Sequence, residues 1–266
     1  MTSIIVRGKN GHELTTKCLA SIMENTPAGS YRLIVVDDGS DPAYTFPCDY
    51  AVRVPVSRGA VTATNLGLGI ALQQTDAPYV LVLDNDTEIP FGDSTWLERF
   101  ISELEENPKT AAVGATTNYT KGKQHIISSP QTYMADWRDD TKPGWNKRPH
   151  GWKANPQVAD FVSFAVLMRR DAVARTGFWD EQFNPGNFED TDYSVQLRAA
   201  GWEIRVARSV YIHHAGHSTF GDDLMRLLET NEGKVLSKWG PGHLWDLGII
   251  PTSVLAEAAK YREERK

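Results

Sequence analysis

The stretch YVLVLDNDTEIP, residues 79–90, joins an apolar run directly to a group of acids. Four of its first five residues are apolar and β-prone, which predicts a buried strand. Asp84, Asp86 and Glu88 then follow within five positions. Residues two apart on a strand point the same way, so we expect Asp84 and Asp86 to face one site at the strand's end.

Strand and helix patterns alternate on both sides of this stretch. Runs typical of strands occupy 3–6, 31–42, 51–59 and 109–115, and runs with helical spacing of apolar residues occupy 11–29, 60–75 and 94–108. This alternation predicts a mostly parallel sheet with helices on both faces, which is a Rossmann-like α/β fold.

The alternation stops after residue 115. Residues 116–158 hold Trp137, Trp145 and Trp152 among many polar residues, without a helical or strand period. A segment this long without regular elements is usually functional or disordered, and its aromatic side chains argue against disorder. We therefore expect an irregular insertion here.

Regular patterns return from residue 160 onwards. A strand and a short helix are expected over 160–177, a helix over 189–201, and two strands over 202–207 and 209–214. Residues 219–266 have helical spacing, with Leu224, Leu228 and Val235 on one face. We expect a helical C-terminal extension there, which is also a candidate surface for homo-oligomer formation.

Composition excludes several classes of protein. The net charge of −6 argues against a general nucleic-acid binder, because phosphate contacts need clustered cations. Two cysteines are too few for a disulfide framework, which favours a reducing compartment. No apolar run approaches the length of about 20 residues that spans a bilayer, and the N-terminus is too short in apolar residues for a signal peptide. We expect a cytoplasmic protein without a transmembrane segment, and peripheral membrane contact stays open.

A second pair of acids, Asp37 and Asp38, ends the strand pattern at 31–42. In open α/β sheets ligands bind beyond the carboxyl ends of the strands, so these acids and Asp84 and Asp86 are expected on one rim. Their mutual repulsion predicts a divalent cation, Mn²⁺ or Mg²⁺, whose remaining ligands are substrate phosphates. The alternative for an isolated Asp-x-Asp is that its acids cap a turn.

Five segments in order resemble family 2 glycosyltransferases, which have the GT-A fold. They are VVDDGS (35–40), SRGAVTATNLGL (57–68), LVLDNDTEI (81–89), FWDEQFNPGNFEDTDYSVQLRAAGWEIRVA (178–207) and HHAGHS (213–218). The resemblance implies a GT-A domain over 1–218, with a nucleotide-binding half at 1–115 and an acceptor-binding half at 116–218. Residues 219–266 would then be the extension.

The resemblance also implies roles for individual residues. Asp37 and Asp38 would lie at the nucleotide-binding strand end, with Asp38 bonded to the base and Arg58 near the base or phosphate. Asp84 and Asn85 would contact the donor. Candidate ligands of the metal that bridges the diphosphate are Asp84, Asp86, His213 and His214. Strand alternation sends the two histidines to opposite faces, and the motif does not say which of them is used.

Two positions depart from the family pattern. The first strand usually ends in a Pro-x-Tyr/Phe-Asn type of sequence, whereas this chain has VRGKN with Arg7 and Lys9, which adds cations that could touch phosphate. Ser163 stands where many members have Gly. The first departure bears on which nucleotide or sugar is read, and the second on the acceptor side.

The implied reaction is metal-dependent transfer of a sugar from a nucleoside diphosphate sugar to an acceptor hydroxyl with inversion. Asp190, in the FED segment, would be the catalytic base. Its helix N-terminus favours the anion and its aromatic neighbours favour the neutral acid, and the sequence does not decide between them. The acceptor could be a glycan, a lipid-linked glycan, a protein or another hydroxyl compound. The aromatic residues of 116–158 would form an acceptor platform or a separate hydrophobic cluster.

Two other functions remain open at this point. The first is a sugar-nucleotide nucleotidyltransferase, for which VRGKNG is a poor triphosphate loop and Asp190 has no role. The second is a non-catalytic glycan- or nucleotide-binding module with this fold. The presence of both Asp86 and Asp190 argues against it.

Overall fold

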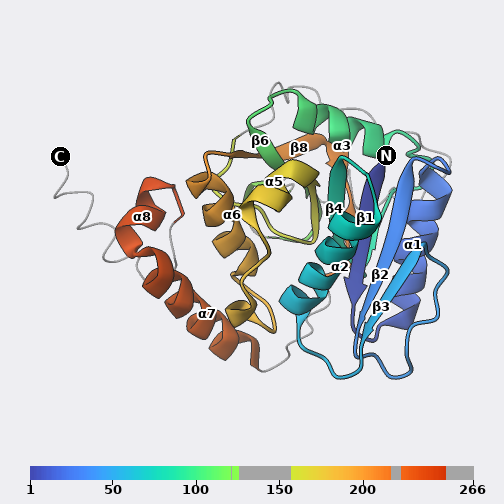
Figure 1. Cartoon of the computed structure of the whole chain (residues 1–266), viewed down its shortest axis with the longest axis horizontal. Coiled ribbons are helices and arrows are strands. Elements are labelled where there is room, and N and C mark those ends of the chain that lie inside the picture. Colours follow the sequence, from blue (N-terminus) through green and yellow to red (C-terminus); the bar gives the residue numbers. More distant parts are fainter. Residues whose placement is uncertain (121, 126–156, 217–222, 250–266) are drawn as a thin grey trace.

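The computed structural model describes residues 1–120, 122–125, 157–216 and 223–249. A seven-stranded sheet in the order β3-β2-β1-β4-β7-β6-β8 forms its centre (Figure 1). The strands are β1 (Thr2–Gly8), β2 (Tyr31–Asp38), β3 (Tyr50–Val54), β4 (Tyr79–Asp84), β6 (Thr110–Thr116), β7 (Ala165–Arg169) and β8 (Glu203–Tyr211). All neighbouring pairs are parallel except those of β7, which runs antiparallel to β4 and β6. The predicted mostly parallel α/β sheet is thus confirmed.

Helices cover both faces of the sheet. Successive strand residues point to opposite sides, so the apolar side chains on both sides of each strand are buried under helices. Ile5 and Val82 belong to the hydrophobic cluster that also contains side chains of α2 (Ala60–Gln74), α5 (Arg170–Thr176) and α6 (Glu189–Ala199). Ile4 and Leu81 belong to the opposite cluster, with α1 (His12–Asn25) and α3 (Trp96–Glu105). The continuous apolar strand runs of the sequence are therefore strands buried on both faces.

The region expected as two strands over 202–207 and 209–214 is arranged differently. Residues 203–211 form the single strand β8, which shifts register against β6 between Ala115 and Thr116. The polar pair Arg208-Ser209 lies inside that shift, so it marks an irregularity within one strand rather than a strand boundary. A second, two-stranded sheet then forms from β5 (Thr87–Glu88) and β9 (His213–His214).

The segment expected as a helical C-terminal extension includes α7 (Leu224–Trp239) and α8 (Pro241–Asp246). Figure 1 shows α7 beside α6, at the end of the molecule away from β3. The indole Nε1 of Trp239 donates to Asp192 of α6 at 2.7 Å, and Lys238 bonds the same carboxyl group at 3.0 Å. The acceptor platform was expected over 116–158 and the oligomer surface over 219–266. Residues 121 and 126–156 of the first segment, and 219–222 and 250–266 of the second, lie outside the described residues.

Two 3₁₀ turns, Gly122–Gln124 and Glu181–Phe183, complete the regular structure of the described ranges. None of the helices in these ranges has the length and apolar character that a membrane crossing requires.

Candidate active site

The carboxyl ends of β1, β2 and β4 meet at one edge of the sheet, and the acids of interest lie there. In the parallel register Arg7 is opposite Asp84, and Gly8 is opposite Asp37. The start of β7 reaches the same edge because β7 runs the other way, and the Asp84 amide donates to the Phe164 carbonyl at 2.9 Å. Residues from the first strands and from the start of β7, far apart in the sequence, therefore surround Asp84.

Asp84, Asp86 and His214 form a cluster able to hold a metal ion. Their ligand atoms lie within 4.8 Å of one another. Pairing of β5 with β9 sets Thr87 opposite His214, and the His214 Nε2 lies 3.3 Å from Asp86 Oδ1. The other ring nitrogen, Nδ1, lies 2.8 Å from the Tyr119 carbonyl oxygen, so it carries a proton and Nε2 faces the acids.

The electrostatics of this cluster favour a cation. Burial disfavours the charged imidazole of His214, but the Asp86 carboxylate, with Asp84 behind it, outweighs burial and raises the pKa of His214 to about 9. The protonated ring then offsets the two carboxylates. A divalent cation would do the same after that proton is lost, because a metal takes neutral imidazole.

His213 takes no part in this cluster of described residues. Its Nδ1 lies 3.3 Å from the Tyr211 hydroxyl, and adjacent residues of a strand point to opposite faces. The sequence left both histidines open, and the geometry groups His214 with the acids.

Asn85, expected among the donor contacts, bonds groups outside the Asp84–Asp86–His214 cluster. Its Nδ2 donates to Thr15 Oγ1 at 2.8 Å and lies 3.2 Å from the Tyr44 hydroxyl. In this arrangement the Asn85 side chain joins the end of β4 to helix α1 and to the loop after β2.

Asp190 lies at the start of α6. Its Oδ2 accepts from the Ser163 amide at 3.3 Å, and its Oδ1 from the Thr191 amide at 2.8 Å. Burial, and after it the Glu189 and Asp160 carboxylates, raise the pKa of Asp190 well above its usual range. The sequence left two opposing effects on the pKa of Asp190, burial and the helix N-terminus, and burial outweighs the helix N-terminus.

Asp160 is a neighbour of Asp190 that the sequence did not reveal. Its Oδ2 accepts from the Thr191 hydroxyl at 3.4 Å, and burial raises its own pKa. Asp160 lies 30 positions before Asp190 in the chain, outside any strand or helix, so no spacing pattern points to it.

Asp37 and Asp38 hold the loops at the end of β2. Asp38 accepts from the Ser57 hydroxyl and from the Arg58 and Gly59 amides at 2.7 to 2.9 Å. Asp37 accepts from the backbone amides of Ser40 and Tyr44 and from Arg53. Each of these two carboxylates already accepts three hydrogen bonds, and those bonds shape the loops. A nucleotide that contacts either carboxylate would have to form an additional bond or replace one of the three.

Arg58 and Arg7, the two expected cationic donor contacts, have different surroundings. The Arg58 guanidinium is exposed and bonds Glu181 at 3.1 Å. Arg7 is only 4% exposed, and its nitrogens bond the Asp84 carboxylate, the Ala60 carbonyl and other internal groups. Arg7 thus faces protein groups in this arrangement, in contrast to the phosphate contact expected for it.

Comparison with known proteins decides the family. The model of "Glycosyl transferase family 2" matches residues 3–177, more than half of the chain. This chain belongs to glycosyl transferase family 2.

Solved structures similar to this family 2 chain share its GT-A fold. A mannosyltransferase, PcManGT from Pyrobaculum calidifontis in complex with GDP-Man and Mn²⁺, has 18% identity and a TM-score of 0.59, over 89% of this chain and 64% of its own. GalNAc-T7 with UDP, GalNAc and Mn²⁺ has 12% identity and a TM-score of 0.60, over 92% and 49%. TarS residues 1–349 from S. aureus have 15% identity and a TM-score of 0.54, over 88% and 65%.

These proteins are longer than this family 2 chain, which spans 64% of the mannosyltransferase and 49% of GalNAc-T7. The curated proteins include no significant match to the sequence.

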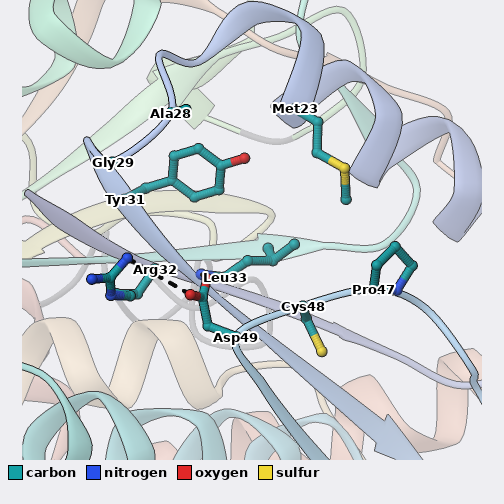
Figure 2. A pocket seen from close by; sticks show the side chains of 9 residues that line it. All are labelled: Met23, Ala28, Gly29, Tyr31, Arg32, Leu33, Pro47, Cys48 and Asp49. Carbon is teal, nitrogen blue, oxygen red and sulfur yellow. Dashed lines mark hydrogen bonds and ion pairs between the residues drawn. The ribbon is translucent and has the colours of Figure 1, made fainter.

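A separate surface pocket lies at the opposite, amino end of β2 (Figure 2). Tyr31, Leu33, Met23 and Cys48 line it, and the Arg32–Asp49 ion pair, 3.7 Å long, crosses its wall. Asp49 also accepts from the Leu33 amide at 2.8 Å. The polar groups of this pocket therefore hold β2 to the start of β3, and the pocket is not part of the acid-lined edge.

Proposed function

We propose that this chain is a metal-dependent inverting glycosyltransferase, which moves a sugar from a nucleoside diphosphate sugar to an acceptor hydroxyl. The observation that carries the proposal is the juxtaposition of two different groups of acids. The first, Asp84 and Asp86 with His214, can hold a metal. The second contains Asp190, a carboxyl group with a raised pKa. Ser163 adjoins Asp190, and the next residue, Phe164, bonds Asp84, so the two groups share one edge.

Asp84, Asp86 and His214 would hold the ion. Bound there, a divalent cation would offset the charge that develops on the leaving diphosphate. We favour Mn²⁺ over Mg²⁺ because the set includes an imidazole, whereas Mg²⁺ prefers oxygen ligands alone. The structures of PcManGT and GalNAc-T7, which share the fold, contain Mn²⁺.

Asp190 would take the proton from the acceptor. The acceptor oxygen bonds to the anomeric carbon while the bond from that carbon to the diphosphate breaks, and the hydroxyl proton passes to the Asp190 carboxylate. Direct displacement of this kind inverts the anomeric configuration. A raised pKa suits the role, because a base is most effective when its pKa is near the working pH.

The other segments of the chain are assigned to the donor, the acceptor and a C-terminal extension. We propose that residues 1–115 bind the nucleotide, with Asp37, Asp38 and Arg58 at the end of β2 and the start of α2. Residues 116–218 would bind the acceptor, and 219–266 would form the extension. The nucleotide contacts would use the Arg58 side chain, which is exposed, more readily than the buried Asp38.

A donor panel tests this function. Uridine, guanosine and other nucleoside diphosphate sugars are incubated with Mn²⁺, Mg²⁺ or a chelator, and the released diphosphate is measured. We expect metal-dependent release with at least one donor, and loss of that activity in Asp86→Ala and Asp190→Asn. The anomeric configuration of the product, determined by NMR, tests inversion.

Other outcomes of the panel would contradict the proposal. In a parallel panel with added pyrophosphate, formation of nucleoside triphosphate and sugar phosphate would indicate a nucleotidyltransferase. Binding of donor or glycan without turnover would indicate a binding module. Wild-type rates in both variants would show that these acids do not carry the reaction.

A further inference from the structure

Arg7 is a buried cation at the centre of the candidate active site. Its side chain is 4% exposed, at the end of β1 where β1 pairs with β4. Its Nε lies 3.1 Å and its Nη2 3.0 Å from Asp84 Oδ1. A guanidinium that contacts one carboxylate oxygen through two nitrogens restricts the orientation of that carboxylate.

The other nitrogen contacts of Arg7 fix the guanidinium itself. Its Nη1 donates to the Ala60 carbonyl at 3.2 Å and to the Thr64 hydroxyl, both in α2. The guanidinium carbon lies 5.8 Å from the centre of the Trp179 ring. Since separate elements hold it, Arg7 has little freedom to leave Asp84 for a ligand.

Ser163 extends this contact to the second group of acids. The Arg7 Nη2 donates to the Ser163 hydroxyl at 2.9 Å. That hydroxyl lies 3.4 Å from Glu189 Oε1, and the Ser163 amide donates to Asp190 Oδ2 at 3.3 Å. A chain of polar contacts therefore runs from Asp84 through Arg7 and Ser163 to Glu189 and Asp190.

The carboxyl groups joined by these polar contacts need a permanent cation. Asp84, Glu189 and Asp190 belong to one small region, and Glu189 is 6% exposed with an Oε2 that has no hydrogen-bond partner among the described residues. Burial raises the pKa of Glu189, and the Arg7 charge opposes that shift. Without Arg7, these carboxyl groups would lose the guanidinium beside them. The positive charge of a guanidinium is present at every working pH.

We propose that Arg7 is a positioning residue of the transfer reaction: through Asp84 on one side and Ser163 on the other, it holds the metal-binding acids and the Glu189–Asp190 pair in fixed relative positions. The proposal rests on the function proposed above. It also accounts for the two departures of this sequence from the family pattern, Arg7 and Ser163, as one hydrogen-bonded pair.

The test is a double-mutant cycle of Arg7→Lys and Ser163→Ala. Lysine keeps the charge but lacks the planar fork that reaches Asp84, Ser163 and α2 together. Alanine removes the Ser163 hydroxyl and keeps the amide that bonds Asp190. The readouts are kcat, the donor KM and the thermal midpoint, measured with the wild-type chain beside each variant.

Matched controls separate positioning from loss of stability. Arg170→Lys removes a fork that bonds the Ala71 and Leu72 carbonyls at the other edge of the sheet. Ser3→Ala removes a buried hydroxyl that bonds Thr75 at the start of β1. We expect both controls to lower the thermal midpoint and to leave kcat unchanged.

The expected result is a selective loss of kcat. Ser163→Ala should lower kcat by about tenfold, the cost of one hydrogen bond to a charged group. Arg7→Lys should lower it by about 100-fold, as expected for a small displacement of reacting groups. The donor KM should change by no more than about twofold in Ser163→Ala, and the double variant should lose no more kcat than Arg7→Lys alone, to within about twofold.

Two results would overturn the positioning role while the proposed function stands. One is a wild-type kcat in Ser163→Ala with an active wild-type enzyme. The other is a pair of losses that multiply in the double variant, since independent effects would show that the two residues do not act together. Absence of transfer by the wild-type chain with every donor would instead overturn the proposed function, and the role of Arg7 with it.

Discussion

At the scale of single residues, the candidate site depends on how each ionisable group is surrounded. Asp190 and Asp37 are both acids at the same edge of the sheet, but their pKa values shift in opposite directions. Burial and neighbouring acids raise the pKa of Asp190. For Asp37 burial acts in the same direction, but hydrogen bonds from Ser40, Tyr44 and Arg53 outweigh it and lower the pKa. The first group suits a base, and the second a structural anion.

The raised pKa of Asp190 predicts a pH dependence. The ionised carboxylate is the active form, so kcat should rise with pH through an inflection above the usual carboxyl range. Asp160→Asn removes a nearby negative charge that raises this pKa, so the inflection should move to lower pH. The check is a kcat–pH profile of each protein.

Asp171→Asn is the control for this profile, because Asp171 is an exposed residue of α5 paired with Arg175. Its profile should match the wild type. An unchanged inflection in Asp160→Asn would show that Asp190 does not govern the acid limb.

The two adjacent histidines predict different effects on metal binding. His214→Ala removes a candidate ligand and should weaken Mn²⁺ binding by about 10- to 100-fold, a range typical of altered metal sites. His213→Ala, which removes a side chain that lies against the Tyr211 hydroxyl and outside the cluster of acids, should leave the affinity within about twofold of the wild type. Titration of Mn²⁺ followed by electron paramagnetic resonance measures both, and equal losses would mean that the cluster is not the site.

At the scale of secondary structure, the loop that leads into Asp190 and helix α6 depends on a helix far along the chain. Asn187 and Phe188 have φ of 70° and 66°, a left-handed conformation that costs energy for residues other than Gly. Helix α7 compensates through Asn231, which is fully buried and donates to the Phe183, Gly186 and Asn187 carbonyls at 2.9 to 3.1 Å. Helix α7 thereby supports the loop that precedes Asp190.

This arrangement predicts that Asn231→Ala will lower the free energy of unfolding by about 2 kcal/mol, because the substitution leaves buried carbonyls without a donor. Thr230→Ala, one residue away and exposed on the same helix, should change it by less than about 0.5 kcal/mol. Urea denaturation of the two variants and the wild type measures the difference. Equal small effects would show that α7 does not hold the loop.

The sequence predicted the order of the elements well and their directions less completely. Alternating apolar runs and helical spacing predicted each element from β1 to α3 except β5, because strands buried on both faces need such runs. The same pattern could not show that β7 runs antiparallel, since local periodicity does not specify the direction in which a strand pairs. That direction matters, because it brings Ser163 to the edge where Asp84 lies.

At the scale of the whole molecule, the two halves of the chain meet at the candidate site. The amide of Ala60 donates to the Pro185 carbonyl at 2.9 Å, and the Asn65 amide nitrogen donates to the Trp179 carbonyl at 2.8 Å. A donor held by groups from both halves would stabilise the folded state of the entire domain by mass action.

This predicts a cooperative ligand effect on thermal stability. A nucleoside diphosphate with Mn²⁺ should raise the thermal midpoint more than the sum of the two added separately, because each would complete the other's binding site. At a concentration of about 100 times the dissociation constant, the stabilisation should be about 2.7 kcal/mol. Asp86→Ala should abolish the joint effect, and a purely additive response would contradict a shared site.

The sequence by itself determined the α/β class, the family pattern and the positions of Asp84, Asp86 and Asp190 at element ends, because periodicity and motif order are properties of the chain. Only the tertiary structure decided which side chains share a site. It grouped His214 and not His213 with the acids, bonded Asn85 to Thr15, and placed Asp160 near Asp190. It also buried Arg7 between Asp84 and Ser163, since contacts across 77 and 156 positions arise from strand pairing and packing, which no local spacing specifies.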